Sequence, residues 1–394
     1  MKKRLLVTAS TFPRWKGDTE PRFVLDLCKH MTDKYLVTVL VPAAPGCADE
    51  EFQEGVHVIR YHYFPIHKWE SLCYPGAIMP RIKEKKIRAL LVPCLLISLW
   101  FKEARIIKQF DLVHSHWLIP QGIVQACFKT PYIVTGHGAD VTSLNKGITR
   151  KLKRKSLEKA SAVTAVSDYL GSVECEIAEG IKPSIISMGV DTSKFGKEYR
   201  KDNYFNQQDK KVVLFVGRLA EKKGVRYLIE AMDKVDNAIL YIVGDGPLKN
   251  ELEELAQKQK TEIVFGGSKN HIELREIYAS ADVFVAPSVT AEDGDQEGLG
   301  LVMLEAMASG LPVVASRSGG IVQVIKDGEN GLLCEEKNQD QIADNINKIL
   351  YDLQIRDTVL KGASQTVKEY DYKNQAEKYM KLYDFVLNES NNLE

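Results

Sequence analysis

The sequence predicts an α/β protein with two domains, each built around a parallel sheet. Short apolar runs typical of buried strands alternate with stretches of helical spacing along most of the 394 residues. The alternation restarts after a polar stretch without periodicity at about 192–210, which we interpret as a linker. A chain of this length is long enough for two domains of ordinary size. We therefore expect domains at 1–190 and 191–370, followed by a helical segment at 371–394.

Composition argues against several classes of protein. Lysine plus arginine number 53, as do aspartate plus glutamate, so no global field would attract nucleic acid. No apolar run approaches the ~20 residues of a membrane span. The seven scattered cysteines contain no CxxC pair and are odd in number, which indicates reduced thiols in a cytoplasmic protein. The apolar run near the N-terminus is too short for a signal peptide and is typical of a first buried strand.

The expected strands of the first domain are short apolar runs. They lie at 4–9, 35–42, 111–116, 131–135 and 162–167. Ser167 is placed to cap the helix that follows the last of them. Because ligands bind at the carboxyl ends of parallel strands, the loop 11–21, which contains Gly17 and Asp18, should face a ligand.

The expected strands of the second domain follow the same pattern. They lie at 212–216, 238–243, 263–265, 281–286 and 313–315. After them, Asp327-Gly328 and Asn330-Gly331 are typical turn dipeptides, and we expect a β-hairpin at 325–333.

The stretch 285–316 carries the strongest chemical signal. Gly298 and Gly300 lead into a helix, and a glycine-rich loop that feeds a helix N-terminus presents unpaired N–H groups to an anion. Glu297 flanks this site, and Glu305 lies inside an otherwise apolar helix, where a carboxylate needs a partner. Phosphate and hydroxyl recognition together indicate a sugar nucleotide. The alternative is an ordinary acidic surface loop with a helix glutamate facing water.

Two cations follow the first strand of the second domain. Arg218 comes directly after Gly217, and Lys223 precedes the next helix. Arginine binds phosphate oxygens in bidentate fashion and lysine acts as a point charge, so the two suit a diphosphate. The alternative is a solvated surface pair. No acidic pair at a strand end is placed to hold a divalent ion; we interpret 293–295 (Asp-Gly-Asp) as a loop.

Two histidines fall at strand ends in the first domain. His116 ends one expected strand, and His137 follows the next within the sequence GHGAD. A zinc site would need three or four well-spaced ligands, and these histidines have no carboxylate or thiol companions at ligand spacing. The glycines on either side of His137 allow a ligand to come close.

These motifs resemble one known family. The arrangement E-x7-E followed by A-x-G-x-P-V-V-A, together with G-R-L-x3-K-G, is similar to the donor site of the retaining GT-B glycosyltransferases of family 4. The resemblance implies two Rossmann-like doubly wound domains that face each other across a cleft. The first would bind acceptor and the second a nucleotide-sugar donor, and the terminal helix would pack back on the first domain. The family's usual G-G-x-E is altered here, because Asp18 replaces the second glycine.

The resemblance also implies roles for individual residues. The catalytic set is His137 beside the transferred sugar, Glu297 on the sugar hydroxyls, and Arg218 and Lys223 on the diphosphate. Glu305 would bind the ribose. The remaining donor-binding candidates are Gly17, Gly217, Gly244, Gly267, Gly298, Leu299, Gly300 and Leu301. The candidates on the acceptor side are Asp18, His116 and Asp140.

The implied activity is retaining transfer of a hexosyl group without a metal or other cofactor. A basic cluster beside an apolar run at 81–108, and a second basic run at 146–159, favour peripheral contact with the inner face of a cell membrane and a lipid-linked saccharide acceptor in polysaccharide or glycan biosynthesis. The alternatives are a buried helix kinked at Pro93 and a solvated helix face. A non-catalytic nucleotide-sugar-binding or membrane-associated scaffold of the same fold remains a rival. A nicotinamide-dependent enzyme is disfavoured, because GxGxxG is missing near the N-terminus.

Overall fold

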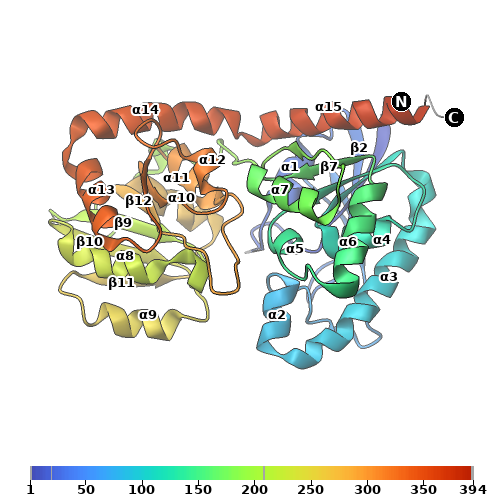
Figure 1. The fold of residues 1–394 in the computed structure, drawn as a ribbon, viewed down its shortest axis with the longest axis horizontal. Helices are drawn as coiled ribbons and strands as arrows, with labels where there is room; N and C mark the ends of the chain where they lie inside the picture. Colours follow the sequence, from blue (N-terminus) through green and yellow to red (C-terminus); the bar gives the residue numbers. More distant parts are fainter. Residues whose placement is uncertain (1, 19, 207–208, 392–394) are drawn as a thin grey trace. The chain divides into compact units, whose positions relative to one another are not determined.

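A computed structural model describes residues 2–18, 20–206 and 209–391, and it divides the chain into two compact units (Figure 1). The first unit combines Met1–Met188 with Gln375–Glu394, and the second is Gly189–Asn374. Residues 207–208 of the expected linker and 392–394 of the terminal segment lie outside the described residues. No helix in the described residues is both long and apolar enough to cross a bilayer.

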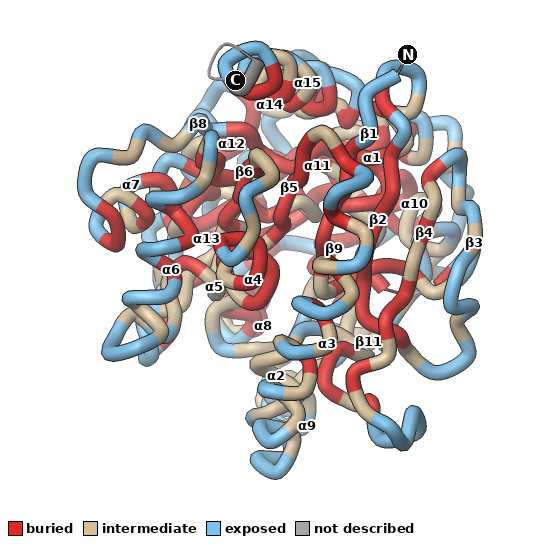
Figure 2. The backbone as a smooth tube through the Cα atoms, turned by 90° about the vertical axis from the view of Figure 1, so that its right-hand side faces the viewer, coloured by how far each residue is buried: buried red, intermediate tan, exposed pale blue. Residues whose placement is uncertain are grey.

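The first unit contains an eight-stranded sheet in the order β3-β4-β2-β1-β5-β6-β7-β8. Its strands are β1 (Lys3–Thr8), β2 (Tyr35–Pro42), β3 (Glu50–Gln53), β4 (Val56–Tyr61), β5 (Leu112–His116), β6 (Tyr132–Gly136), β7 (Ala162–Ala165) and β8 (Ser184–Ile185). The β3–β4 pair is antiparallel, and the other neighbouring pairs are parallel. The central strands are almost wholly buried, as the red segments of Figure 2 show.

Seven helices of the first unit connect these strands along the described chain. They are α1 (Phe23–Lys29), α2 (Ile78–Glu84), α3 (Leu91–Ile106), α4 (Ile123–Gln125), α5 (Ala139–Thr142), α6 (Gly147–Lys159) and α7 (Asp168–Ile177). The Ser167 hydroxyl accepts a hydrogen bond from the Leu170 N–H and caps α7, which confirms the expected cap.

The C-terminal helix α15 (Tyr372–Asn391) supplies side chains to the core of the first unit. Tyr379 and Tyr383 are fully buried. The Tyr383 hydroxyl lies 2.7 Å from Nδ1 of His114 on β5. The Tyr35 hydroxyl of β2 donates to Asp384 at 2.7 Å. From Gln375 onward the helix is therefore part of this unit, although it follows the second unit in sequence.

The second unit contains a six-stranded parallel sheet in the order β11-β10-β9-β12-β13-β14. Alternate residues of β9 face two different apolar clusters: Val212 and Leu214 belong to one, Val213 and Phe215 to the other. A sheet covered on both faces needs apolar residues at successive positions, which explains the unbroken apolar runs. The strands are β9 (Lys211–Val216), β10 (Ala238–Val243), β11 (Ile263–Gly267), β12 (Val283–Ala286), β13 (Val313–Ser316) and β14 (Leu332–Cys334). The helices are α8 (Val225–Ala231), α9 (Lys249–Ala256), α10 (His271–Ser280), α11 (Leu301–Ala308), α12 (Ile321–Val324), α13 (Gln339–Tyr351) and α14 (Leu353–Glu369).

One local expectation was wrong, and one alternative is excluded. The segment 325–333 is not a β-hairpin: residues 327–331 form a tight loop, and β14 pairs in parallel with β13. The turn dipeptides do mark the loop. The apolar run after them forms β14, which extends the sheet and does not pair with the residues before the loop. Pro93 does not kink its helix, because α3 begins at Leu91 and a proline in the first turn removes no intrahelical hydrogen bond.

Candidate active site

The second sheet has a strand order that concentrates ligand contacts at one point. Counted along the chain its strands lie in the order 3-2-1-4-5-6, so the winding reverses between β9 and β12. In open α/β sheets, ligands bind beyond the carboxyl ends of the strands at this switch point. Arg218 and Lys223 follow β9, and Glu297 follows β12. The cations and the carboxylate predicted for donor binding therefore belong to one switch point.

Lys223 and Glu297 form an ion pair there. Lys223 ends the short helix η6 (Glu221–Lys223), and its ammonium donates to Oε2 of Glu297. The two side chains are only 17% and 14% exposed. Burial alone would raise the pKa of Glu297, but the Lys223 ammonium outweighs it, and the pKa is lowered. Glu297 is thus an ionised acceptor for hydroxyl groups, whereas Arg218 is exposed at the end of β9.

The acidic loop before Glu297 is tied to η6. The Lys222 ammonium lies 2.9 Å from Oδ2 of Asp295. The Glu292 N–H donates to Oε1 of Glu221 at 3.0 Å. The Asp295 carboxylate is therefore engaged by a lysine, in keeping with the interpretation of 293–295 as a loop.

The start of α11 depends on Gly300 and on the loop that contains Gly319 and Gly320. Gly300 is the residue before the helix and has a left-handed φ of 79°, which a side chain would disfavour. The Gly320 N–H donates to the carbonyl of Glu297 at 2.9 Å. A Cβ at Gly319 would lie 2.3 Å from that same carbonyl oxygen, so the backbone at 297 is packed against this loop. Lys223, Glu297 and Gly300 line one pocket.

The remaining donor-binding candidates on α11 and its approach differ in accessibility. Leu299 is 5% exposed and belongs to an apolar cluster, so its side chain serves packing. Gly298 contributes its N–H to Glu297 and lowers the pKa of that carboxyl. Leu301 begins the helix and is partly buried against the same cluster as Leu299.

Glu305 has the partner that its position requires. It lies on α11, and the hydroxyl of Tyr278, a fully buried residue of α10, donates to its Oε2 at 3.0 Å. A hydrogen bond from a buried phenol stabilises a carboxylate that faces partly apolar surroundings.

Three predicted glycines lie at the ends of adjacent strands. Gly217 follows β9, Gly244 follows β10, and Gly267 ends β11. The Gly244 N–H donates to the Gly267 carbonyl at 2.9 Å. A Cβ at Gly244 would lie 1.9 Å from the Gly217 carbonyl oxygen. Contact between the two loops therefore requires glycine at 244 whether or not a ligand binds.

The first sheet has its own switch point, between β1 and β5. The loop 11–21 follows β1, and His116 ends β5. His116 Nδ1 lies 2.8 Å from Nε2 of His137, which follows β6. The structure thus brings together the two histidines that the sequence placed at strand ends.

His137 is a neutral imidazole in an aromatic environment. Burial lowers its pKa to about 3. Its ring lies 4.9 Å from that of Trp117 and 5.3 Å from that of Phe23, between centroids. Trp117 has a φ of 72°, which is rare for a residue other than glycine and is typical of functional sites. His116 is also neutral, because burial and the neighbouring His114 and His137 lower its pKa. Its Nε2 is buried without a hydrogen-bond partner.

Asp140 fixes the backbone around His137. Its carboxylate accepts hydrogen bonds from the N–H groups of Leu118 at 2.8 Å, His137 at 3.1 Å and Gly138 at 2.9 Å. These contacts join the segments that follow β5 and β6. Asp140, which was expected on the acceptor side, therefore positions the loop that carries His137.

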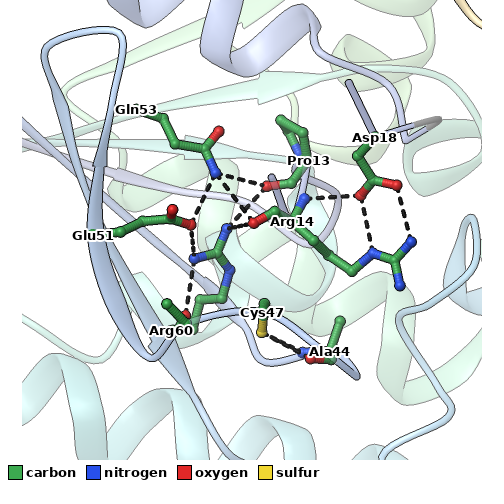
Figure 3. Close-up of polar contacts among 9 residues, drawn as sticks. Pro13, Arg14, Asp18, Ala44, Cys47, Glu51, Gln53 and Arg60 are labelled. Carbon is green, nitrogen blue, oxygen red and sulfur yellow. Dashed lines mark hydrogen bonds and ion pairs between the residues drawn. The ribbon is translucent and has the colours of Figure 1, made fainter. Parts of the chain in front are cut away.

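Asp18 is engaged by an arginine of its own loop (Figure 3). The Arg14 guanidinium donates to both Asp18 oxygens at 3.0 Å. It also lies over the rings of Trp15 and Tyr74, at 3.9 and 3.6 Å from their centroids. Gly17 takes a φ of 87° in the turn between the pair. Where the family has a second glycine, this chain has a carboxylate that closes the loop.

Two buried ionisable residues near the loop that carries His137 were not predicted. Lys153 lies in a basic run that suggested a solvated helix face, yet it is fully buried and donates to Asn145 Oδ1 at 2.8 Å and to the carbonyl of Val141. Glu174 on α7 is fully buried, and burial, with a smaller effect of Asp140, raises its pKa to about 9. Helical spacing could have found both: Lys153 precedes the buried Leu157 by four positions, and Glu174 precedes the buried Ile177 by three.

One group of described residues is spaced to hold a metal ion: His62, His67 and Glu70. These residues lie in the segment after β4 and were not predicted as ligands.

Comparison with known proteins gives the family. Residues 21–194 match the family described as Glycosyltransferase Family 4, and residues 197–366 match Glycosyl transferases group 1. A glycosyltransferase of Methanocaldococcus jannaschii is 31% identical over 306 residues, which are 71% of this chain and 77% of that protein. The chain belongs to the family 4 glycosyltransferases. This confirms the resemblance on which the site residues were chosen.

One further sequence and one solved structure are similar to this family 4 glycosyltransferase. A GDP-mannose-dependent α-(1-6)-phosphatidylinositol monomannoside mannosyltransferase of Mycobacterium tuberculosis is 32% identical over 237 residues, covering 56% of this chain and 60% of that protein. The structure of sucrose-phosphate synthase from Thermosynechococcus elongatus matches with a TM-score of 0.78 at 22% identity, over 98% of this chain and 99% of that one. With the two parallel-sheet units, this confirms the GT-B fold of two Rossmann-like domains.

Proposed function

We propose that the protein is a retaining, metal-independent hexosyltransferase. It takes a sugar from a nucleotide-sugar donor and transfers it to a lipid-linked saccharide at the cytoplasmic face of a cell membrane, in polysaccharide or glycan biosynthesis. The observation that carries the proposal is the ion pair of Lys223 with Glu297 at the switch point of the second sheet, where Arg218 is exposed in the loop that follows β9. The family membership and the GDP-mannose dependence of one relative support the donor class.

In this proposal the donor site works by charge complementarity. Arg218 and Lys223 stabilise the negative charge that grows on the diphosphate as the bond from the anomeric carbon breaks, which is usually the largest catalytic effect in such reactions. Glu297 accepts hydrogen bonds from sugar hydroxyls, and Glu305 from the ribose. The acceptor oxygen forms the new bond on the same face of the sugar, and its proton leaves with the diphosphate.

The neutral state of His137 limits its role. A group whose pKa is lowered to about 3 carries no charge at pH 7, so His137 contributes one hydrogen bond and ring contact. In the proposal it orients the donor sugar. Its orientation is set by Nε2 contact with His116, and by the three backbone hydrogen bonds that Asp140 accepts.

The membrane part of the proposal rests on one face of the first unit. Leu90, Ile97 and Phe101 are exposed and recur at intervals of seven and four residues, so they share a face of the α3 region. Exposed lysines precede α3 at positions 83, 85 and 86. Apolar side chains beside a basic cluster suit the interface of an anionic bilayer. The lipid substrate in the name of the mycobacterial relative agrees with this surface.

The experiment is a thermal-shift titration of purified protein with UDP-, GDP- and ADP-sugars in the presence of EDTA. A donor that binds the folded state raises its stability, by ~2.7 kcal/mol at a hundredfold excess over the dissociation constant. We expect a selective shift without metal. A shift that appears only after magnesium is restored would refute metal independence. Donor binding with no turnover of any acceptor in a membrane extract would favour the non-catalytic scaffold.

A further inference from the structure

The segment that follows β4 brings two histidines and a glutamate together. His62 comes directly after the strand, His67 begins the short helix η1 (His67–Trp69), and Glu70 follows that helix. Each offers one ligand atom, and the three atoms lie within 4.8 Å of one another. All three come from nine consecutive residues of the first unit, so the grouping depends only on local structure.

The glutamate is held in a fixed orientation. Its side chain is only 2% exposed. Its Oε1 accepts hydrogen bonds from the N–H groups of Tyr63 and Phe64, the latter at 3.0 Å. Its Oε2 is thereby directed at Nδ1 of His62, 2.7 Å away. Both ends of the segment are therefore joined before any ligand binds.

The second nitrogen of His62 also has a carboxylate partner. Its Nε2 lies 3.1 Å from Oδ1 of Asp49. If Nε2 carries the proton and donates it to Asp49, the lone pair of Nδ1 faces the lone pairs of Glu70. Two acceptors at that distance repel each other unless a cation lies between them. A carboxylate that binds the far nitrogen of a histidine is the usual way in which proteins orient a metal-binding imidazole.

A proton is the simplest such cation, and His62 would then be an imidazolium between two carboxylates. That explanation gives His67 no role. The His67 ring lies parallel to the His62 ring, with centroids 3.5 Å apart and 7° between the planes. It is exposed, so it can rotate about its side-chain bonds and bring a ring nitrogen into line with a shared ion.

We propose that His62, His67 and Glu70 bind a divalent transition-metal ion, with Asp49 orienting His62. Two imidazoles and one carboxylate suit zinc or a similar ion, because magnesium and calcium prefer ligand sets made of oxygen. Three protein ligands leave a position for water. The site lies in the first unit, whereas Lys223 and Glu297 lie in the second, so the proposed ion is separate from the ion pair on which the proposed donor binding depends.

A metal bound at this site would also act on the loop 11–21, through the chain that follows Glu70. The chain continues from Glu70 to Tyr74, whose ring contacts Arg14, and to Gly76, whose N–H donates to Glu20 at 3.0 Å. A metal that ties Glu70 to the end of β4 therefore stabilises the support of the loop 11–21.

The test uses untagged, full-length protein freed of metal with a chelator and then dialysed. Zinc is added in competition with a chromogenic chelator, and cobalt is added separately to record the visible spectrum of the bound ion. We expect one ion per chain. His67→Ala should abolish stoichiometric binding, and because His67 is exposed this variant should fold. Asp49→Asn should weaken binding by about 10–100-fold.

The matched control is His57→Ala, which removes a histidine of β4 that pairs with Glu50 and has no part in the site. It should bind like the unchanged protein. The absence of binding to the unchanged protein would show that a proton bridges Glu70 and His62, and would overturn the proposal. Equal binding by the unchanged protein and His67→Ala would overturn it as well. Neither result depends on donor binding or transfer.

Discussion

At the scale of single residues, Arg218 and Lys223 contribute unequally to the positive charge of the proposed donor site. Lys223 is paired with Glu297 and little exposed, whereas Arg218 is exposed. The charge of Lys223 is partly neutralised before any donor arrives. Arg218 therefore supplies most of the positive charge that a diphosphate would meet.

We expect Arg218→Ala to lower kcat/KM for transfer by roughly 10²–10³-fold, the usual cost of losing one group that stabilises developing negative charge. The melting temperature should change little, because exposed substitutions usually alter stability by less than ~0.5 kcal/mol. Steady-state kinetics with the donor identified by thermal shift would measure the effect. Arg226→Ala, which removes an exposed arginine of α8, is the control. Turnover within threefold of normal would exclude Arg218 from diphosphate binding.

Residue types at strand ends could be predicted from sequence, but their partners could not. Motif spacing predicted Lys223 and Glu297 in the loops that follow two expected strands, and the structure brings these two side chains together in an ion pair. The spacing did not show that Asp18 binds Arg14, or that Asp140 accepts three backbone hydrogen bonds. Such pairings depend on loop conformations, and short-range sequence patterns do not encode them.

At the scale of elements, α7 packs a buried acid against the end of β6. A Cβ at Gly136 would lie 2.3 Å from Oε1 of Glu174, so glycine is needed there to admit the carboxyl group. Both oxygens of Glu174 are buried without a hydrogen-bond partner. Burial raises the pKa of Glu174 to about 9, so the group is neutral at pH 7.

This shift predicts a pH dependence of stability. The pKa of Glu174 is higher in the folded state than in the unfolded state. Its contribution to the free energy of unfolding is therefore fully present below about pH 4.5 and is lost as the pH rises toward 9. Through this titration the free energy of unfolding falls by at most ~1.4 kcal/mol per pH unit. Glu174→Gln has no such titration, so its melting temperature should nearly equal that of the unchanged protein at pH 5 and exceed it increasingly toward pH 9.

Scanning calorimetry of both proteins from pH 5 to 9 would measure this difference. Titration of the buried histidines affects both proteins alike and cancels in the comparison. The control is Glu158→Gln on α6, which changes an exposed glutamate paired with Arg154. A difference between Glu174→Gln and the unchanged protein that stays constant over this range would mean that Glu174 is already ionised in the folded state.

Element types were more predictable than element ends. The strands of the second sheet were found because residues that alternate between two apolar clusters form unbroken apolar runs. The segment 325–333 was misassigned because Asp-Gly and Asn-Gly mark a reversal of the chain, whereas the destination of the next strand depends on which sheet edge is open.

At the scale of the whole molecule, equal numbers of acidic and basic residues conceal a local asymmetry. The exposed apolar residues of the α3 region lie next to a basic segment, and α6 carries a second exposed basic face. Sequence predicted the two basic runs, but it could not assign their faces. The structure shows that Leu95 and Leu99 face the core and that Ile97 and Phe101 face outward.

We expect the triple variant Leu90→Ser, Ile97→Ser, Phe101→Ser to lose binding to vesicles that contain anionic phospholipid. All three side chains are more than half exposed, so the fold should survive. Sedimentation with vesicles measures the bound fraction, and donor-induced thermal shifts confirm folding. Leu353→Ser, at an equally exposed leucine of the second unit, is the control. Unchanged sedimentation of the triple variant would exclude this face as the membrane contact.

The contribution of α15 to the first unit has a consequence for how the protein is made. Domains generally fold in the order in which the ribosome delivers them. Here the first 188 residues emerge without Tyr379 and Tyr383, which fill their core. The second unit can complete its fold as soon as Asn374 has emerged, before the residues of α15 that belong to the first unit have been made. The first unit is therefore completed only after the second unit has been synthesised, and a nascent chain that has reached Asn374 contains all residues of the second unit but not all of the first.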